Sequence, residues 1–157
     1  MPAFETMRGQ RVVATPAALD TALAVLASST RPFFSGGAVP NAAPDRPRTT
    51  AQDVVLPLRI APDEVLVFGA LGPPGLTIPG DEHAIVVDET GFSARWFTWT
   101  DYAQVVAPQV EWRLPAERPA LGQGRVAGVP AKLWCTDDGV LVLVPTAYAH
   151  DLQERLA

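Results

Sequence analysis

Ser35 is one of the few residues of this sequence whose neighbours suit the binding of a ligand. It follows Phe33 and Phe34 and precedes Gly36 and Gly37, so its hydroxyl and the backbone N–H groups of the glycines suit an anion. The segment lacks the G-x-S-x-G turn that exposes the nucleophile of hydrolases. A flexible loop is therefore the alternative interpretation, and the residues favour it.

Arg95 is a second candidate, because it lies inside the aromatic-rich stretch Ser93–Trp99. An arginine in such a strand requires a carboxylate, an aromatic ring or a bound anion. An ion pair with Asp88 or Asp101 is the alternative to ligand binding. Asp88 is accordingly the third candidate ligand-binding residue.

The sequence contains no set of residues that predicts catalysis, and we assign no catalytic residue and no metal ligand. His83 and His150 lie far apart, and Cys135 ends an apolar run, which favours a small core residue over a nucleophile. The stretch Gly122–Gly124 is similar to part of a nucleotide-binding fingerprint, but no helix follows it. Whether the chain is an enzyme stays open.

Composition limits the class of protein. The chain has 157 residues, of which 48% are hydrophobic and 18% charged, which predicts one domain over residues 1–157. A formal charge of −5 argues against nucleic acid as a partner. No apolar run is long enough for a membrane helix, no secretory signal is evident, and there is one cysteine, so we expect a cytoplasmic protein without a membrane partner.

Periodicity places the elements of the first half. Thr15-Pro16 opens a helix whose leucines recur at helical spacing, whereas residues 31–53 show no pattern and predict a mobile loop. Val54–Ile60 and Glu64–Phe68 are predicted strands joined by a turn that contains proline and aspartate. Ala84–Val87 is a short and wholly apolar strand.

The second half predicts more strands and two helices. After Ser93–Trp99 we expect a short helix over Asp101–Ala107, further strands from Leu121, and a last helix over Ala147–Leu156. The apolar runs around Val65, Val86 and Leu141 are typical of central strands covered on both faces. The predicted class is α+β, a mostly antiparallel sheet with about three helices packed on it.

Aromatic residues in or near irregular segments are candidate interface residues, since aromatic side chains are enriched at protein interfaces. They are Phe33, Phe34, Trp99 and Trp112.

Four pieces of the chain between Val54 and Leu156 resemble a known family. Ile60–Val67 is similar to a turn-plus-strand segment "G-P-D-E-W-L-L", and Val86–Asp88 with the aromatic strand resembles the strand pair that follows it. Gly122–Pro130 resembles a strand "Q-x-R-L-A-x-V-P", and Pro145–Ala149 resembles the start of a last helix "R-S-Y-A/F-A". These motifs are similar to those of the gamma subunit of heterotetrameric sarcosine oxidases, in the folate-binding T-protein-like family.

The resemblance implies a non-catalytic accessory subunit of a bacterial flavin-dependent amine oxidase of the sarcosine type. It implies larger oxidoreductase subunits as partners, no cofactor on this chain, and folate or flavin on the partner chains. Two alternatives stay open. One is a stand-alone protein or enzyme that binds a small molecule, folate or an anion, under the loop 31–53. The other is a homodimeric interaction module, with homo-oligomer contacts through the same aromatic residues.

Overall fold

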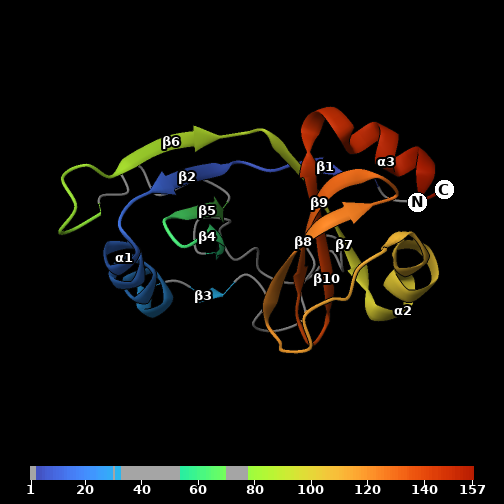
Figure 1. Ribbon diagram of the computed structural model, residues 1–157, viewed down its shortest axis with the longest axis horizontal. Helices are drawn as coiled ribbons and strands as arrows, with labels where there is room; N and C mark the ends of the chain where they lie inside the picture. The colour runs from blue at the N-terminus through green and yellow to red at the C-terminus, as the bar shows by residue number, and fades with distance from the viewer. Residues whose placement is uncertain (1–2, 30, 33–53, 70–77) are drawn as a thin grey trace, which may run out of the picture. The chain divides into compact units, whose positions relative to one another are not determined.

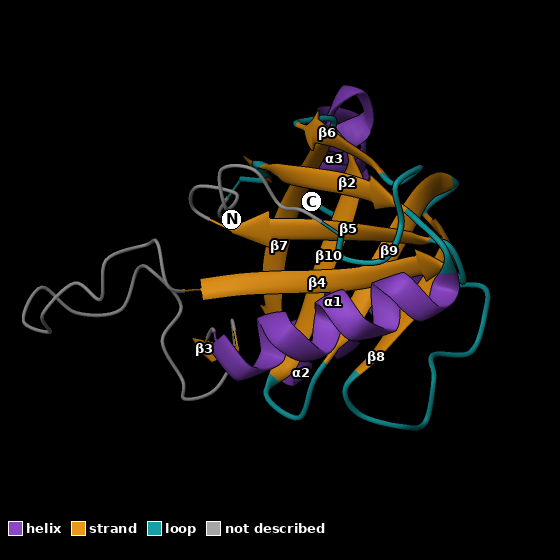
Figure 2. Ribbon diagram, turned by 90° about the vertical axis from the view of Figure 1, so that its left-hand side faces the viewer, coloured by secondary structure: helices purple, strands orange, loops and turns teal. Residues whose placement is uncertain are grey.

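The computed structural model of the protein describes residues 3–29, 31–32, 54–69 and 78–157. The chain divides into two compact units, which we call the N-terminal unit (Arg8–Thr90) and the C-terminal unit (Met1–Met7 with Gly91–Ala157). Each unit has a five-stranded sheet of its own (Figures 1 and 2). The predicted α+β class with mostly antiparallel pairing is confirmed. One domain over residues 1–157 stays a prediction, and residues 33–53 of the expected loop lie outside the described residues.

The sheet of the N-terminal unit has the strand order β3-β4-β5-β2-β6. β3 and β4 are parallel, and all other pairs are antiparallel. The predicted turn forms the β4–β5 hairpin, with Pro62 and Asp63 at its tip. The strands are β2 (Gly9–Val13), β3 (Arg31–Pro32), β4 (Val54–Ala61), β5 (Glu64–Gly69) and β6 (Ile85–Glu89).

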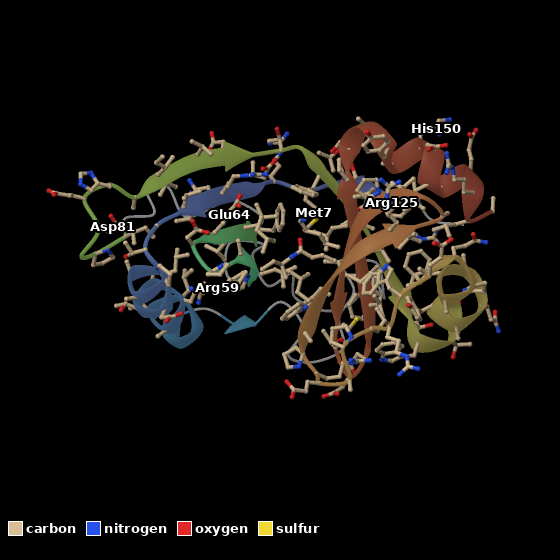
Figure 3. All side chains as sticks on the ribbon, viewed as in Figure 1. Met7, Arg59, Glu64, Asp81, Arg125 and His150 are labelled. Carbon is tan, nitrogen blue, oxygen red and sulfur yellow. The ribbon has the colours of Figure 1, made fainter. Side chains whose placement is uncertain are left out.

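Helix α1 (Pro16–Ser29) packs on one face of this sheet. Leu19, which is fully buried, joins Val12, Val65 and Val67 in one core cluster, because alternate residues of each strand point to the same face. Arg59 connects the helix to the β4–β5 hairpin through an ion pair with Asp20 and a hydrogen bond to the Pro62 carbonyl (Figure 3).

The sheet of the C-terminal unit is wholly antiparallel, with the order β1-β7-β10-β9-β8. β1 comes from the start of the chain, where Glu5 pairs with Ala94. The strands are β1 (Glu5–Thr6), β7 (Phe92–Thr98), β8 (Ala120–Val126), β9 (Val129–Cys135) and β10 (Gly139–Pro145).

β10 is the central strand, as its apolar sequence predicts. It lies between β7 and β9, and every residue from Gly139 to Val144 is buried. Gly139 has a φ of 158°, and a Cβ there would meet the Phe97 carbonyl oxygen at 2.3 Å. The tight entry to β10 therefore requires glycine.

Helical segments follow β7 and β10. The first comprises α2 (Trp99–Asp101), the π-helical η2 (Tyr102–Val106) and the 3-10 turn η3 (Ala107–Gln109). Thr98 caps it, because its hydroxyl accepts the Asp101 N–H at 3.1 Å. The second comprises the 3-10 turn η4 (Thr146–Tyr148) and α3 (Ala149–Arg155).

Helical spacing over Ala147–Leu156 would place Tyr148 on the sheet with Leu152 and Leu156, but Tyr148 is exposed, so this expectation is wrong for Tyr148. Leu152 and Leu156 are buried in the core cluster of the unit. The α-helix begins only at Ala149, and a 3-10 turn has three residues per turn, so the helical spacing does not extend back to Tyr148. Thr146 lies in that turn and forms no side-chain cap.

The expectation that the strand around Val86 is central is also wrong. β6 lies at the edge of its sheet and pairs only with β2. Val86 faces the same side as the buried Val12, whereas Ile85 and Val87 are exposed. An apolar run indicates a central strand only when another element covers its second face and its second edge.

Candidate functional site

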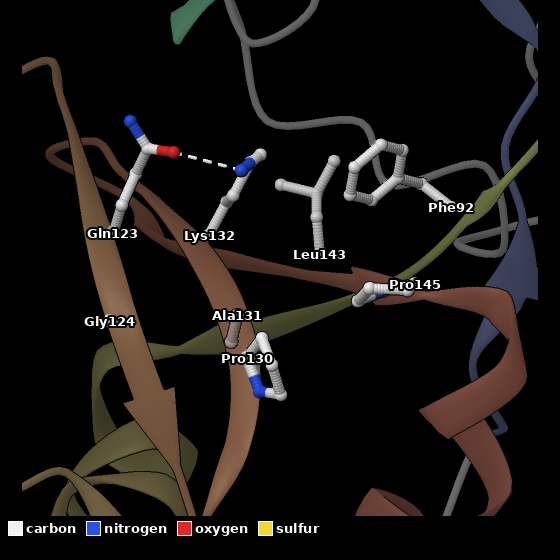
Figure 4. Close-up of a pocket in the computed structure, with 8 residues that line it drawn as sticks. All are labelled: Phe92, Gln123, Gly124, Pro130, Ala131, Lys132, Leu143 and Pro145. Carbon is white, nitrogen blue, oxygen red and sulfur yellow. Dashed lines mark hydrogen bonds between the residues drawn. The ribbon is translucent and has the colours of Figure 1, made fainter.

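A cavity of about 250 Å³ opens on one face of the C-terminal sheet (Figure 4). Strands β7 to β10 all contribute to it, and the cavity has a mostly apolar wall and one ammonium group, that of Lys132. Its lining residues are Phe92, Gln123, Gly124, Pro130, Ala131, Lys132, Leu143 and Pro145.

The pairing register of β8 and β9 determines where the polar groups of this cavity lie. Ala127 and Gly128 both have positive φ, 49° and 79°, as a type I′ two-residue hairpin turn requires, and they join β8 to β9. Counting outward from this turn pairs Gln123 with Lys132, and their side chains form a hydrogen bond of 2.8 Å. Sequence reasoning missed this pair, although the hairpin register was the signal that could have found it.

The geometry around Lys132 suits binding rather than reaction. Its ammonium nitrogen lies 5.7 Å from the centre of the Phe92 ring, and Leu143 is its neighbour in β10. An ammonium beside an apolar wall attracts a small carboxylate that carries an apolar group. Lys132 is the one lysine of the chain, and the lining residues include no carboxyl, imidazole or thiol group that could transfer a proton.

Arg95 belongs to the same sheet but to its opposite face, because Phe92 and Ala94 alternate with it along β7. Its side chain is 8% exposed, and its guanidinium carbon lies 4.3 Å from the centre of the Phe97 ring. The aromatic contact expected from the sequence is therefore present.

Two nitrogens of this guanidinium, Nε and Nη1, are buried without a hydrogen-bond partner among the described residues. Burial lowers the pKa of Arg95, and the nearby Asp101 carboxylate opposes that shift. No ion pair links the two side chains within the described part of the chain; the Asp101 carboxylate instead accepts a hydrogen bond of 2.8 Å from the Thr98 hydroxyl. Arg95 is thus a buried cation in the C-terminal unit, with two N–H donors that have no partner among the described residues.

The structure does not place the other two candidate ligand-binding residues relative to the Lys132 cavity or to Arg95. Asp88 is an exposed residue of β6 in the N-terminal unit, so its pairing with Arg95 stays a prediction. Ser35 lies outside the described residues, as do the candidate interface residues Phe33 and Phe34.

Trp99 has its polar and apolar partners within the C-terminal unit. Its indole N–H donates to the Thr136 and Asp137 carbonyls at 3.1 and 3.0 Å, which holds the β9–β10 turn. The Tyr102 ring meets it edge-on at 5.5 Å, and the Arg118 guanidinium lies 4.9 Å from its centre. These contacts account for the residue, and its role at an interface stays a prediction.

The position of the Trp112 ring explains why β8 has glycine at residues 122 and 124. A Cβ at Gly124 would approach the Trp112 indole to 2.3 Å, and one at Gly122 to 2.7 Å, so both must be glycine for the ring to lie on the strand. The indole N–H donates to the Arg125 carbonyl at 2.9 Å. The Gly-Gln-Gly spacing thus serves packing, and an interface role for Trp112 likewise stays a prediction.

Metal-ligating and nucleophilic residues do not gather in the described part of the chain, where no group of three or more His, Cys, Asp or Glu side chains could hold a metal ion. Cys135 is buried in the core of the C-terminal unit, and burial raises the pKa of its thiol. His83 and His150 are exposed, each beside a glutamate, at 3.7 and 3.4 Å. Within residues 3–29, 31–32, 54–69 and 78–157, no helix is long and apolar enough to cross a membrane.

No family model matches the sequence, and no curated protein sequence matches it. One similar solved structure is heterotetrameric sarcosine oxidase from Corynebacterium sp. U-96 in complex with pyrrole 2-carboxylate, with a TM-score of 0.60 and 20% sequence identity. The match covers 99% of this chain and 83% of that chain.

The chain has a sarcosine oxidase subunit-like fold. The fold expected from the resemblance of Val54–Leu156 is therefore confirmed, and the match extends over nearly the whole chain. Because coverage is high in both directions, the sarcosine oxidase chain that matches is of similar length. At this sequence identity the likeness defines the fold and no individual site residue.

Proposed function

We propose that this chain is a non-catalytic accessory subunit of a heteromeric flavin-dependent amine oxidase of the sarcosine type. One observation carries the proposal: the fold corresponds over 99% of the chain to a chain of similar length from a heterotetrameric sarcosine oxidase. The proposal assigns the chain to a cytoplasmic bacterial assembly, where larger oxidoreductase subunits hold the flavin, the folate and the reacting groups.

The cavity at Lys132 supports the assignment of the flavin, the folate and the reacting groups to other subunits. Its volume of about 250 Å³ lies below the roughly 300–1,000 Å³ of typical ligand and cofactor sites, so it suits neither a flavin nor a folate. Apart from the Lys132 ammonium, its lining residues include no carboxyl, imidazole or thiol group for proton transfer, which supports assigning chemistry on an amine to residues of another chain.

Purification of the tagged chain from its native host tests the proposal. We expect a flavoprotein in stoichiometric amount, with the visible absorbance of bound flavin, and hydrogen peroxide production when a secondary amine such as sarcosine is added. The separated chain should show no turnover, and adding it back to the flavoprotein should restore the stability of the assembly. Recovery of the chain alone, without a flavoprotein, would contradict the proposal.

A second candidate function is a stand-alone binder of small anions, and the Lys132 cavity is the observation that favours it. Calorimetric titration of the isolated chain with small aromatic and aliphatic carboxylates, and with folates, separates the two. A binder should lose affinity in Lys132→Met, which keeps the length of the side chain and removes its charge, and should keep it in Lys132→Arg. No heat of binding for the wild-type chain would exclude this alternative.

A further inference from the structure

The described strands present four sheet edges, and three of them are protected against pairing with another chain. β1 and β3 are only two residues long. β8 is covered where Trp112 lies on its glycines and where Val110 forms a bridge to Val126. Short or covered edges are the usual means by which proteins avoid unwanted strand pairing.

β6 is the exception. It has five residues, and Ile85, Val86, Val87 and Asp88 make no main-chain hydrogen bond to described residues other than those of the β2 pairing. In an antiparallel pair every second residue directs its N–H and C=O groups away from the partner strand, so on this edge these groups have no main-chain partner among the described residues. Figures 1 and 2 show β6 beside β2, at the end of the strand order of this sheet.

The side chains of β6 match a strand that another chain completes. Ile85 and Val87 are 56% and 47% exposed on one face, although the run Ala84–Val87 has the apolar composition of a central strand. An additional strand on the free edge would turn β6 into an internal strand and would place its own side chains beside Ile85 and Val87 on the same face. The composition of the strand and its position then agree.

Charge identifies the kind of strand that fits. Residues 81–89 contain four carboxylates, Asp81, Glu82, Asp88 and Glu89, and no lysine or arginine. Arg11 of β2 pairs with Glu89 at 3.0 Å, and Asp81 accepts two backbone N–H groups, whereas Glu82 and Asp88 are exposed. A second copy of this chain would bring the same negative charges to the edge, so a basic strand is the complementary partner.

We propose that β6 is a docking edge for an extended segment of a partner chain, in which apolar residues alternate with lysine or arginine. The segment pairs with β6 through main-chain hydrogen bonds, packs apolar side chains beside Ile85 and Val87, and places its basic side chains beside Glu82 and Asp88. The inference rests on the proposed function in that the partner is a larger subunit of the oxidase assembly.

Three variants test it in the assembly purified from the native host: Ile85→Lys, Ile85→Glu and the control Val25→Lys. Both substitutions at Ile85 remove the apolar contact, but only lysine repels a basic segment. We expect Ile85→Lys to weaken binding of the flavoprotein by about tenfold or more, and Ile85→Glu to weaken it clearly less. Val25 is 59% exposed on α1, so Val25→Lys makes a comparable change elsewhere on the same unit and should leave binding within about twofold.

Hydrogen exchange on the wild-type chain provides a measurement that needs no variant. Amides of residues 85–88 should exchange slowly in the assembly and faster in the isolated chain. A wild-type chain that binds no flavoprotein would overturn the proposed function and this inference with it. Equal binding by Ile85→Lys and wild type, with unchanged exchange, would overturn the inference alone. So would an isolated dimer that Ile85→Lys converts to a monomer, because the occupant would then be a second copy.

Discussion

Replacing Arg95 by methionine should stabilise the protein, although the substitution removes a charge from its core. The guanidinium leaves Nε and Nη1 buried without a partner among the described residues, and each unsatisfied group costs about 1–3 kcal/mol. Its contact with the Phe97 ring returns about 0.5–2 kcal/mol. Methionine has a similar length, fills the same space and keeps a favourable contact with the ring.

The expected gain in the free energy of unfolding is therefore about 1–3 kcal/mol, which corresponds to about 2–4 °C in Tm for each kcal/mol. Urea denaturation followed by tryptophan fluorescence is the suitable assay, because all four tryptophans lie in the C-terminal unit together with Arg95. They are Trp96, Trp99, Trp112 and Trp134.

Arg95→Lys is the matched control. It keeps the positive charge but replaces the flat guanidinium by a more strongly hydrated ammonium, so it should be less stable than the wild type. A loss of more than about 1 kcal/mol in Arg95→Met would refute the reasoning, because it would mean that the guanidinium is well satisfied in the folded protein. A gain would mean that this arginine is kept at a cost to stability, as residues with a binding role often are.

Four further predictions concern the C-terminal unit and a loop of the N-terminal unit. Leu141→Asp places a carboxylate in the central strand, where Leu141 is 5% exposed, and should cost several kcal/mol, which abolishes soluble expression; a normal Tm would contradict this. Leu152→Ala should lower the free energy of unfolding by about 2–5 kcal/mol in urea titrations, since Leu152 is fully buried. Gly124→Ala should displace the Trp112 indole, seen as red-shifted emission together with a lower Tm, and unchanged emission would disprove the packing. The backbone N–H groups of Thr15 and His83 lower the pKa of Asp81 in the folded protein. The ionised carboxylate therefore stabilises the fold fully above pH 3.8, and this stabilisation is lost as the pH falls through the folded pKa. The Tm difference between wild type and Asp81→Asn should vanish at low pH.

Much of the fold could be predicted because its signals are local. The turn at Pro62 and Asp63, the apolar run of β10 and the proline that begins α1 each depend on a few adjacent residues. β6 was mispredicted because an apolar run does not show whether a neighbouring strand exists. The division into two sheets was not evident either, because strand periodicity does not say which strands pair.

The candidate site was harder to predict for the same reason. Gln123 and Lys132 meet only through the register of the β8–β9 hairpin, and Phe92 reaches them from a strand on the far side of β10. Arg95 could be singled out from its aromatic surroundings, but its lack of an ion pair with the described residues depends on where Asp101 points. Long-range placement, rather than residue type, decides these features.

The position of β1 has a consequence for how the chain folds as it is synthesised. Residues 5–6 leave the ribosome before the N-terminal unit, but their partner β7 emerges only after the whole of that unit. That unit can fold in the meantime, and its β2–β6 pairing brings Gly9 and Glu89 opposite each other. The two ends of the inserted segment are then already adjacent when Met7 donates its N–H to the Phe92 carbonyl at 2.8 Å, so most of the entropy of loop closure has been lost beforehand. A destabilised N-terminal unit should therefore delay the completion of the C-terminal sheet during translation, even though that sheet contains none of its residues.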